Sequence, residues 1–139
     1  MSYLLDTNFL SELRRPRRMA PNVQHWLGTI DLRGTYISAL SVFELEYGAV
    51  RAERKGLSHA PLLREWIDTQ ILPDFEGRIL PFDETVALRY ARLQAGDLRP
   101  YADVMIAATA LVHSLTVVTR NIDDFRPHGV ALLNPWEAA

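Results

Sequence analysis

The chain has 139 residues, of which 48% are hydrophobic and 23% are charged, and its formal net charge is −2. This length and composition are typical of one folded domain with a buried core, and they exclude an intrinsically disordered chain. The sequence contains no Cys, which excludes a disulfide framework and a thiolate metal site, and which is compatible with a cytoplasmic location. No apolar stretch reaches the roughly 20 residues that span a bilayer, so we expect no membrane association.

Strands and helices alternate along the sequence. The run Tyr3–Asp6 predicts a first strand, Thr7–Leu13 a helix that Pro16 ends, and the apolar spacing from Asn22 to Ile30 a second helix. The later elements expected are a strand over Thr35–Ser38, helices over Ser41–Lys55 and Ala60–Leu72, a strand over Arg78–Phe82, a helix capped by Asp83 and running to Ala95, a helix over Tyr101–Ser114, and strands over Leu115–Thr119 and Ala131–Leu133. This alternation predicts a single α/β domain over residues 1–139, with a central, mainly parallel sheet of about five strands flanked by helices.

Four acidic residues fall where predicted strands end or where the following helices begin. Asp6 ends the first strand, Glu44 and Asp103 lie in the first turns of two helices, and Asp124 follows the fourth strand. In a parallel sheet these positions share one edge, so we expect the four side chains to lie together. Crowded carboxylates raise one another's pKa unless a cation lies between them. A ligand set made only of oxygen predicts Mg²⁺ or Mn²⁺, which suits phosphodiester hydrolysis by a metal-activated water.

Each of these acidic residues also has a purely structural explanation. Ser41-x-x-Glu44 matches a capping box, and taken alone this is the stronger explanation of Glu44. A helix N-terminus favours an acidic residue such as Asp103, although its neighbours are apolar and a buried, unpaired carboxylate is costly. Asp123 and Asp124 are adjacent, and we expect one of them to be a solvated loop residue. It is much less probable that all four acidic residues at one sheet edge are purely structural than that any one of them is.

The acidic residues belong to four motifs, which are Leu5-Asp6-Thr7-Asn8, Glu44-Leu45-x-x-Gly48, Asp103-x-x-Ile106-Ala107-Ala108 and Thr119-Arg120-Asn121-x-x-Asp124-Phe125. In this order, and over essentially the whole chain, they resemble the PIN-domain ribonucleases, most of all the VapC and FitB-like toxins of bacterial toxin–antitoxin pairs. The segments Ile79–Asp83 and Asn134–Trp136 are also similar to the FitB-like group. One departure is the compact stretch Gly96–Tyr101, where relatives often have a longer, glycine-containing segment.

The resemblance implies a PIN-like fold and a toxin that acts as a Mg²⁺- or Mn²⁺-dependent endoribonuclease. It implies a catalytic, metal-binding set with supporting polar residues around it, namely Asp6, Glu44, Asp103 and Asp124, supported by Thr7, Asn8, Thr119 and Asn121. It also implies an RNA substrate, a cognate antitoxin, a homodimer, contact with DNA only through the antitoxin, and action in the cytoplasm. Candidates for the antitoxin surface, which fit the core equally well, are Leu10, Leu13, Val42 and Leu45. The Ala-rich helix around Ala107, Ala108 and Ala110 fits self-association and burial against its own sheet equally well.

RNA has to be brought to an acidic site by local positive charge, because a net charge of −2 provides no general attraction. The candidate RNA contacts are the basic run and one arginine beside the fourth motif, namely Arg14, Arg15, Arg17, Arg18 and Arg120. A solvated loop is the simpler explanation of the run, because exposed basic clusters are common. Trp136 is a candidate for base stacking, whereas Trp26 and Trp66 lie on apolar helix faces and are expected in the core.

Two other classes of function stay open at this point. One is a PIN-fold binding module with weak or no catalysis, which acts through its antitoxin partner. The other is a phosphohydrolase with Asp6 as a covalent nucleophile, in the manner of the haloacid-dehalogenase-like enzymes. Those enzymes have a second Asp two residues after the first, and here Asn8 stands at that position.

Overall fold

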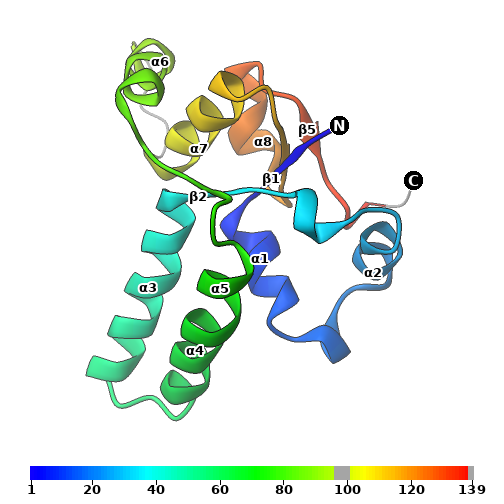
Figure 1. Ribbon diagram of the computed structural model, residues 1–139, viewed down its shortest axis with the longest axis vertical. Coiled ribbons are helices and arrows are strands. Elements are labelled where there is room, and N and C mark those ends of the chain that lie inside the picture. Colours follow the sequence, from blue (N-terminus) through cyan, green and yellow to red (C-terminus); the bar gives the residue numbers. More distant parts are fainter. Residues whose placement is uncertain (96–100, 138–139) are drawn as a thin grey trace.

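The computed structural model describes residues 1–95 and 101–137 (Figure 1). Of the compact stretch Gly96–Tyr101, residues 96–100 lie outside the described part. The strands within that part are β1 (Tyr3–Leu5), β2 (Ile37–Ser38), β3 (Ile79–Leu80), β4 (Thr116–Val118) and β5 (Leu132–Leu133). Every strand pairing among them is parallel, which confirms the predicted class of sheet.

The strands form a three-stranded sheet in the order β1-β4-β5 and a two-stranded sheet of β2 and β3. Tyr36, just before β2, connects the two sheets. Its N–H donates to the Tyr3 carbonyl and its carbonyl accepts from the Leu5 N–H, both at 2.9 Å. In the larger sheet Leu5 pairs with Val118. The residues that follow these two strands, Asp6 and Thr119, are therefore neighbours at the carboxyl edge of the sheet.

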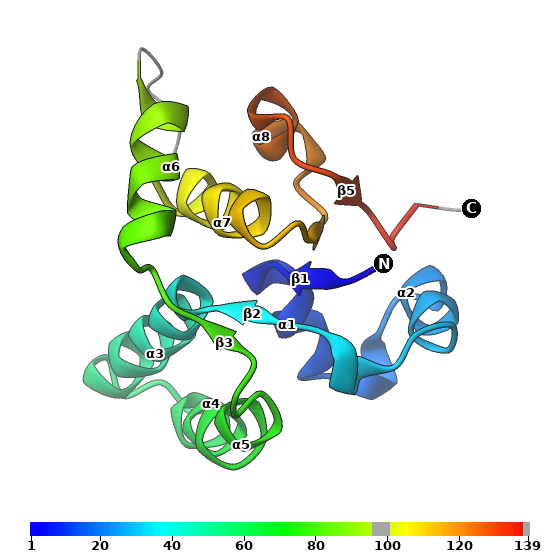
Figure 2. The same ribbon diagram turned by 45° about the horizontal axis from the view of Figure 1, so that its top comes forward.

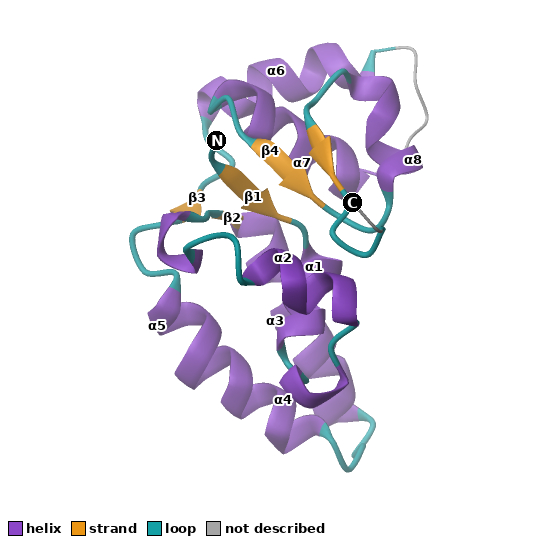
Figure 3. Cartoon of the chain, turned by 90° about the vertical axis from the view of Figure 1, so that its right-hand side faces the viewer, coloured by secondary structure: helices purple, strands orange, loops and turns teal. Residues whose placement is uncertain are grey.

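The helices follow the strands in the predicted order. They are α1 (Thr7–Leu13), η1 (Pro16–Arg18), α2 (Pro21–Leu27), η2 (Leu32–Gly34), α3 (Ala39–Arg54), α4 (Ala60–Trp66), η3 (Ile67–Ile71), α5 (Leu72–Asp74), α6 (Glu84–Gln94), α7 (Tyr101–Val112), α8 (Ile122–Phe125) and η4 (Arg126–His128). Helices α1 and α3 lie on one side of β1, and α7 and α8 lie on the other (Figures 2 and 3). The result is a layered α/β architecture with the sheet in the middle.

Helix α3 begins earlier than the sequence pattern predicts. Ser38, the last residue of β2, is its N-cap, and the Ser38 hydroxyl accepts a hydrogen bond from the Leu40 N–H at 3.0 Å. Ser41 therefore lies inside the helix, and Glu44 falls in the second turn instead of the first. The capping-box explanation of Glu44 is wrong, because a residue in that position has no free N-terminal backbone group of its own helix to satisfy.

Other boundaries also differ from the predicted ones. Helical structure does not end before Pro73, as predicted, but continues to Asp74. The preceding segment η3 is π-helical, and this wider turn accommodates Pro73, which has no backbone N–H to donate. Helix α2 ends at Leu27, with Gly28 as its C-cap, three residues short of the predicted end. The short helix α8 has no counterpart among the predicted elements. The cap of α6 is as predicted, because the Asp83 side chain accepts from the Val86 N–H at 3.0 Å.

The core has two parts, one on each side of the sheet. Leu5 packs in a cluster with Phe9, Val23 and Leu45, while its neighbour Leu4 packs in a cluster with Phe125. Since successive strand side chains point to opposite faces, β1 is buried on both sides, which explains its uninterrupted apolar run. No helix within the described residues is long and apolar enough to cross a membrane.

Most of the residues that were candidates for interaction surfaces are buried in this core. Leu10 and Leu45 are buried, and Leu13 and Val42 pack against the same cluster. Burial in the core, the other explanation offered for these residues, is therefore the one observed for Leu10 and Leu45, whereas Leu13 and Val42 keep part of their surface exposed and stay candidates for the antitoxin surface. The small residues of α7 are likewise buried inside the chain, as Ala107, Ala108 and Ala110 have no exposed surface. Of the two explanations offered for the Ala-rich helix, burial against its own sheet is the one observed.

Candidate active site

Asp6 lies at the centre of the candidate site, at the junction of β1 and α1. Its side chain is 4% exposed and both of its oxygens have partners. Oδ1 accepts from the Thr7 N–H at 2.8 Å, which makes Asp6 the N-cap of α1, and Oδ2 accepts from the Thr119 hydroxyl at 2.8 Å. Burial raises the pKa of Asp6 above its ordinary value of 3.8, and the charges of Glu44 and Asp124 raise it further, while the two hydrogen bonds oppose the rise.

Glu44 is held at the site by Thr7. The Thr7 Oγ1 donates to Glu44 Oε1 at 2.8 Å and lies 2.9 Å from the Ser41 Oγ. Ser41 is fully buried and is the site residue that the sequence analysis missed. Its position one helical turn before Glu44 was the available signal, but the capping-box pattern assigned it another role. These contacts connect the first turn of α1 to the first two turns of α3.

Asp103 and Asp124 complete the acidic group from the other side of the sheet. Asp103 lies in the first turn of α7, as predicted, and Asp124 lies in α8. The pKa of Asp103 is raised to about 6 by burial first, then by the charges of Asp6, Asp124 and Glu44, and by a hydrogen bond with Asp124. The predicted proximity of the four carboxylates is thus present, because the other three all act on Asp103.

The adjacent acidic pair in the fourth motif divides as expected. Asp123 is exposed and forms an ion pair with Arg126 at 2.8 Å, whereas Asp124 is half-buried and interacts with Asp103. Asp123 therefore lies outside the acidic group even though it follows the same strand.

The predicted supporting residues converge on one hydroxyl. Thr119 Oγ1 accepts from Asn8 Nδ2 at 3.2 Å and from the Asn121 N–H at 3.0 Å, while it donates to Asp6. The Asn8 Oδ1 in turn accepts from the Arg120 N–H at 3.3 Å. Asn121 takes part through its backbone, and its exposed side chain has no hydrogen bond within the part of the chain that the structure describes.

The chemistry of the acidic group fits a hard divalent cation. Four carboxylates with two raised pKa values form a region in which negative charge is poorly compensated, and carboxylate oxygens are the ligands of Mg²⁺ and Mn²⁺. In residues 1–95 and 101–137, no three His, Cys, Asp or Glu side chains converge closely enough to form a ready-made coordination shell.

The predicted RNA-contact arginines are not part of the acidic group. The basic run follows the C-terminal end of α1, which is far from the acidic group. Of its arginines, Arg14 is half-buried, and the other three, Arg15, Arg17 and Arg18, are exposed. Arg120 is exposed, and its guanidinium lies over the Trp136 ring, 5.5 Å from the centroid.

The three tryptophans divide between the core and its margin. Trp26 packs edge-on against Tyr3 and Phe9, and Trp66 is buried, so both belong to the core as expected. Trp136 is half-buried, packs edge-on against Phe9 and lies under the Arg120 guanidinium, so it stands at the margin of the core and its role in base stacking stays a prediction.

Comparison with known proteins agrees with this fold and this arrangement. The sequence model of the PIN domain matches residues 3–128. The chain belongs to the PIN-domain family. Its layered α/β fold is therefore that of a PIN domain, as the four motifs predicted.

Individual PIN-domain relatives match nearly the whole chain. The protein is 43% identical to Toxin FitB of Neisseria gonorrhoeae, over 96% of this chain and 97% of that one. It is 35% identical to VapC ribonuclease Y4jK of Sinorhizobium fredii, over 98% and 99%. Among solved structures, it matches FitAcB from Neisseria gonorrhoeae with a TM-score of 0.83 and 41% identity, over 98% of this chain and 99% of that chain.

Proposed function

We propose that this chain, as one PIN-like domain over residues 1–139, is the toxin of a toxin–antitoxin pair and acts as a Mg²⁺- or Mn²⁺-dependent endoribonuclease. The observation that carries the proposal is the crowding of four carboxylates, in which three of them raise the pKa of the fourth, Asp103. The similarity to a FitB toxin and to a VapC ribonuclease supports the substrate class and the toxin role.

Asp6, Glu44, Asp103 and Asp124 would hold the cation. When bound, it supplies a nucleophilic water at neutral pH and neutralises the charge that develops on the phosphate. The protein's own contribution is to fix the carboxylates in place. Thr7 and Thr119 occupy one oxygen of Glu44 and one of Asp6, so these side chains enter the reaction already oriented.

The similarity to toxins of toxin–antitoxin pairs also indicates which molecules this protein binds. The solved structure of FitAB bound to an IR36 DNA fragment is similar to this chain, with a TM-score of 0.84 and 40% identity over 99% of this chain. We therefore propose a cognate antitoxin that inhibits this protein, contact with DNA through that antitoxin, and action on RNA in the cytoplasm. The homodimer that the resemblance implies stays a prediction, which the molecular mass in solution checks.

The two alternatives differ in how well they explain the site. A binding module without catalysis does not account for four carboxylates kept close together at an energetic cost. A phosphohydrolase with Asp6 as nucleophile needs a second acid at the position of Asn8, and the Asn8 amide is instead engaged by Thr119 and Arg120.

The test is RNA cleavage by the purified protein on a broad RNA panel, in Mg²⁺, Mn²⁺ or EDTA. Asp124→Asn and Asp123→Asn form a matched pair, because the residues are adjacent and only Asp124 belongs to the acidic group. We expect metal-dependent cleavage that falls at least about 100-fold in Asp124→Asn and changes less than about twofold in Asp123→Asn. Cleavage that persists in EDTA, or that falls equally in both variants, contradicts the proposal. No cleavage by the unmodified chain, together with no metal binding, would favour the binding module.

A further inference from the structure

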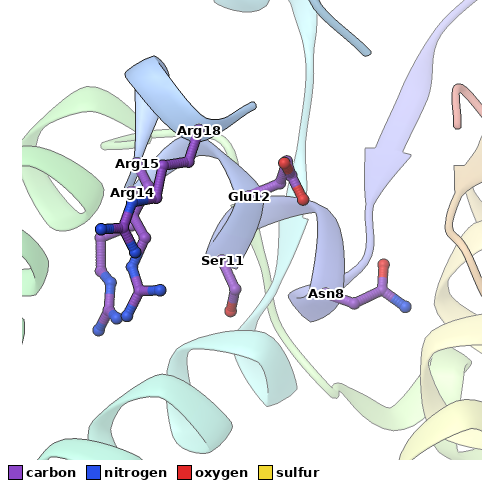
Figure 4. Close-up of a pocket in the computed structure, with 6 residues that line it drawn as sticks. All are labelled: Asn8, Ser11, Glu12, Arg14, Arg15 and Arg18. Carbon is purple, nitrogen blue, oxygen red and sulfur yellow. The ribbon is translucent and has the colours of Figure 1, made fainter. Parts of the chain in front are cut away.

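A second polar site adjoins the acidic group along α1. It is a hollow of about 360 Å³, lined by Asn8, Ser11, Glu12, Arg14, Arg15 and Arg18 (Figure 4). Three of these residues come from the basic run after α1. The 3₁₀ turn η1 carries Arg18 back to the same hollow as Arg14 and Arg15. The hollow is thus a concave surface with three guanidinium groups at its wall.

The positive charge of the hollow is only partly offset by the protein, because three arginines and one glutamate line it. Within residues 1–95 and 101–137, no ion pair includes Arg14, Arg15 or Arg18. Burial and the neighbouring charge of Arg15 both lower the pKa of Arg14, which means that the two cations lie close together. The one acidic lining residue, Glu12, accepts from the Ala20 N–H at 3.1 Å and pairs with none of the three arginines within the described residues, so the lining keeps an excess of positive charge. Such a surface attracts an anion.

The hollow connects directly to the acidic group through Asn8. Asn8 lines the hollow, and its amide donates to Thr119, the residue whose hydroxyl donates to Asp6. Asn8 lies in the first turn of α1 and the arginines follow its last residue, Leu13, so the length of this seven-residue helix, about 10 Å, separates them along the chain. An anion held by the arginines therefore lies beside the acidic group and not inside it.

We propose that this hollow binds a phosphate of the RNA strand other than the one that is cleaved, an inference that rests on the proposed function. Guanidinium groups bind phosphate oxygens through paired hydrogen bonds, and Ser11 adds a neutral polar group between the arginines and Asn8 (Figure 4). The acidic group repels a polyanion, so a strand that enters it needs an anchoring phosphate site nearby. The arginine hollow provides that anchor and sets the direction in which the strand runs along α1.

The basic run contains its own control. Arg17 is exposed and belongs to the same run, but it does not line the hollow. If the run acts only as a diffuse basic patch, Arg17 matters as much as its neighbours. If the hollow is a phosphate site, Arg14, Arg15 and Arg18 matter and Arg17 does not.

The experiment measures binding of a fluorescein-labelled, random-sequence 12-nucleotide RNA by anisotropy, in EDTA and over a series of salt concentrations. Binding in EDTA does not depend on cleavage, so this result is separate from a failure of the proposed nuclease activity. We expect the triple variant R14Q/R15Q/R18Q to bind at least about tenfold more weakly, with a salt slope reduced by about one. We expect R17Q to bind within about twofold of the unmodified chain.

A second variant guards against a loss of folding. R14K/R15K/R18K keeps the three charges but loses the paired guanidinium geometry, so we expect it to keep the salt slope and to bind with intermediate affinity. Equal binding by R14Q/R15Q/R18Q and the unmodified chain overturns the proposal, as does equal weakening by R17Q. Loss of antitoxin binding with unchanged RNA binding also overturns it, because the hollow would then hold an acidic protein segment.

Discussion

The Thr119 hydroxyl fixes the position of the most buried carboxylate of the site. It donates to Asp6 and accepts from Asn8 and from the backbone of Asn121. A buried carboxylate that loses such a partner stays desolvated without compensation, which costs about 1–3 kcal/mol. The same loss raises the pKa of Asp6 further, because the Thr119 hydrogen bond lowers it.

Thr119→Val should therefore reduce both stability and metal-dependent cleavage. We expect the free energy of unfolding to fall by about 1–3 kcal/mol and cleavage at pH 7 to fall severalfold, with part of the cleavage recovered at higher pH. Chemical denaturation and a pH series of cleavage rates measure these effects. Thr116→Val, at the other end of β4, is the control. Equal behaviour of the two variants would contradict the assigned role of Thr119.

The raised pKa of Asp103 should make the stability of the metal-free protein depend on pH. Its pKa is about 6 when folded, against an ordinary value of 3.8. The folded state holds this proton more tightly than the unfolded state, so the associated stability is fully present below pH 3.8 and is lost as the pH rises through 6. At pH 7.5 the metal-free protein carries the cost of an ionised Asp103.

Asp103→Asn removes that cost. In EDTA at pH 7.5 we expect the Tm to rise by about 3 °C, which corresponds to about 1 kcal/mol after allowance for the partial exposure of the side chain. The gain should shrink at pH 5. Thermal unfolding followed by circular dichroism measures it, with Asp123→Asn as the exposed control. An unchanged or lower Tm at pH 7.5 would show that ionised Asp103 does not destabilise the metal-free protein.

At the scale of elements, the start of α3 decides where Glu44 points. The Ser38 cap puts the first turn at Ala39, so Ser41 and Glu44 both face Thr7 at the start of α1. A helix that began at Ser41 would have used Glu44 for its own N-terminus. The cap is therefore part of the construction of the site as well as of the helix.

Ser38→Ala should weaken the protein by about 1 kcal/mol, since the Leu40 N–H loses its acceptor. We expect a Tm lower by about 3 °C and a drop in cleavage larger than this loss of stability explains, because α3 carries Glu44. Ser2→Ala, at the exposed N-terminus, is the control. A normal Tm for Ser38→Ala would mean that the observed cap does not determine the start of α3.

At the scale of the whole molecule, the sequence predicted the class and order of the elements well, because buried parallel strands and amphipathic helices have distinct apolar patterns. It also predicted the edge of the sheet at which the carboxylates meet. It did not predict the start of α3, since Ser38 and Ser41 are both suitable caps and the choice depends on the pairing of β2 with β3. The arginine hollow was equally unpredictable, as it forms only when η1 turns back toward α1.

The parallel order of the strands also explains why residues far apart in sequence form one site. Pairing of Leu5 with Val118 brings Asp6 next to Thr119, and the helices that follow the strands add Glu44, Asp103 and Asp124. The site is thus a property of the topology, and it requires the complete domain.

The most direct test of this account is a calorimetric titration of Mn²⁺ into the metal-free protein, with Asp124→Asn and Asp123→Asn titrated in parallel. The account predicts that the unmodified chain and Asp123→Asn bind Mn²⁺ with equal affinity, and that Asp124→Asn binds at least about tenfold more weakly. No binding by the unmodified chain, or equal binding by all three proteins, would contradict the claim that the acidic group is a cation site.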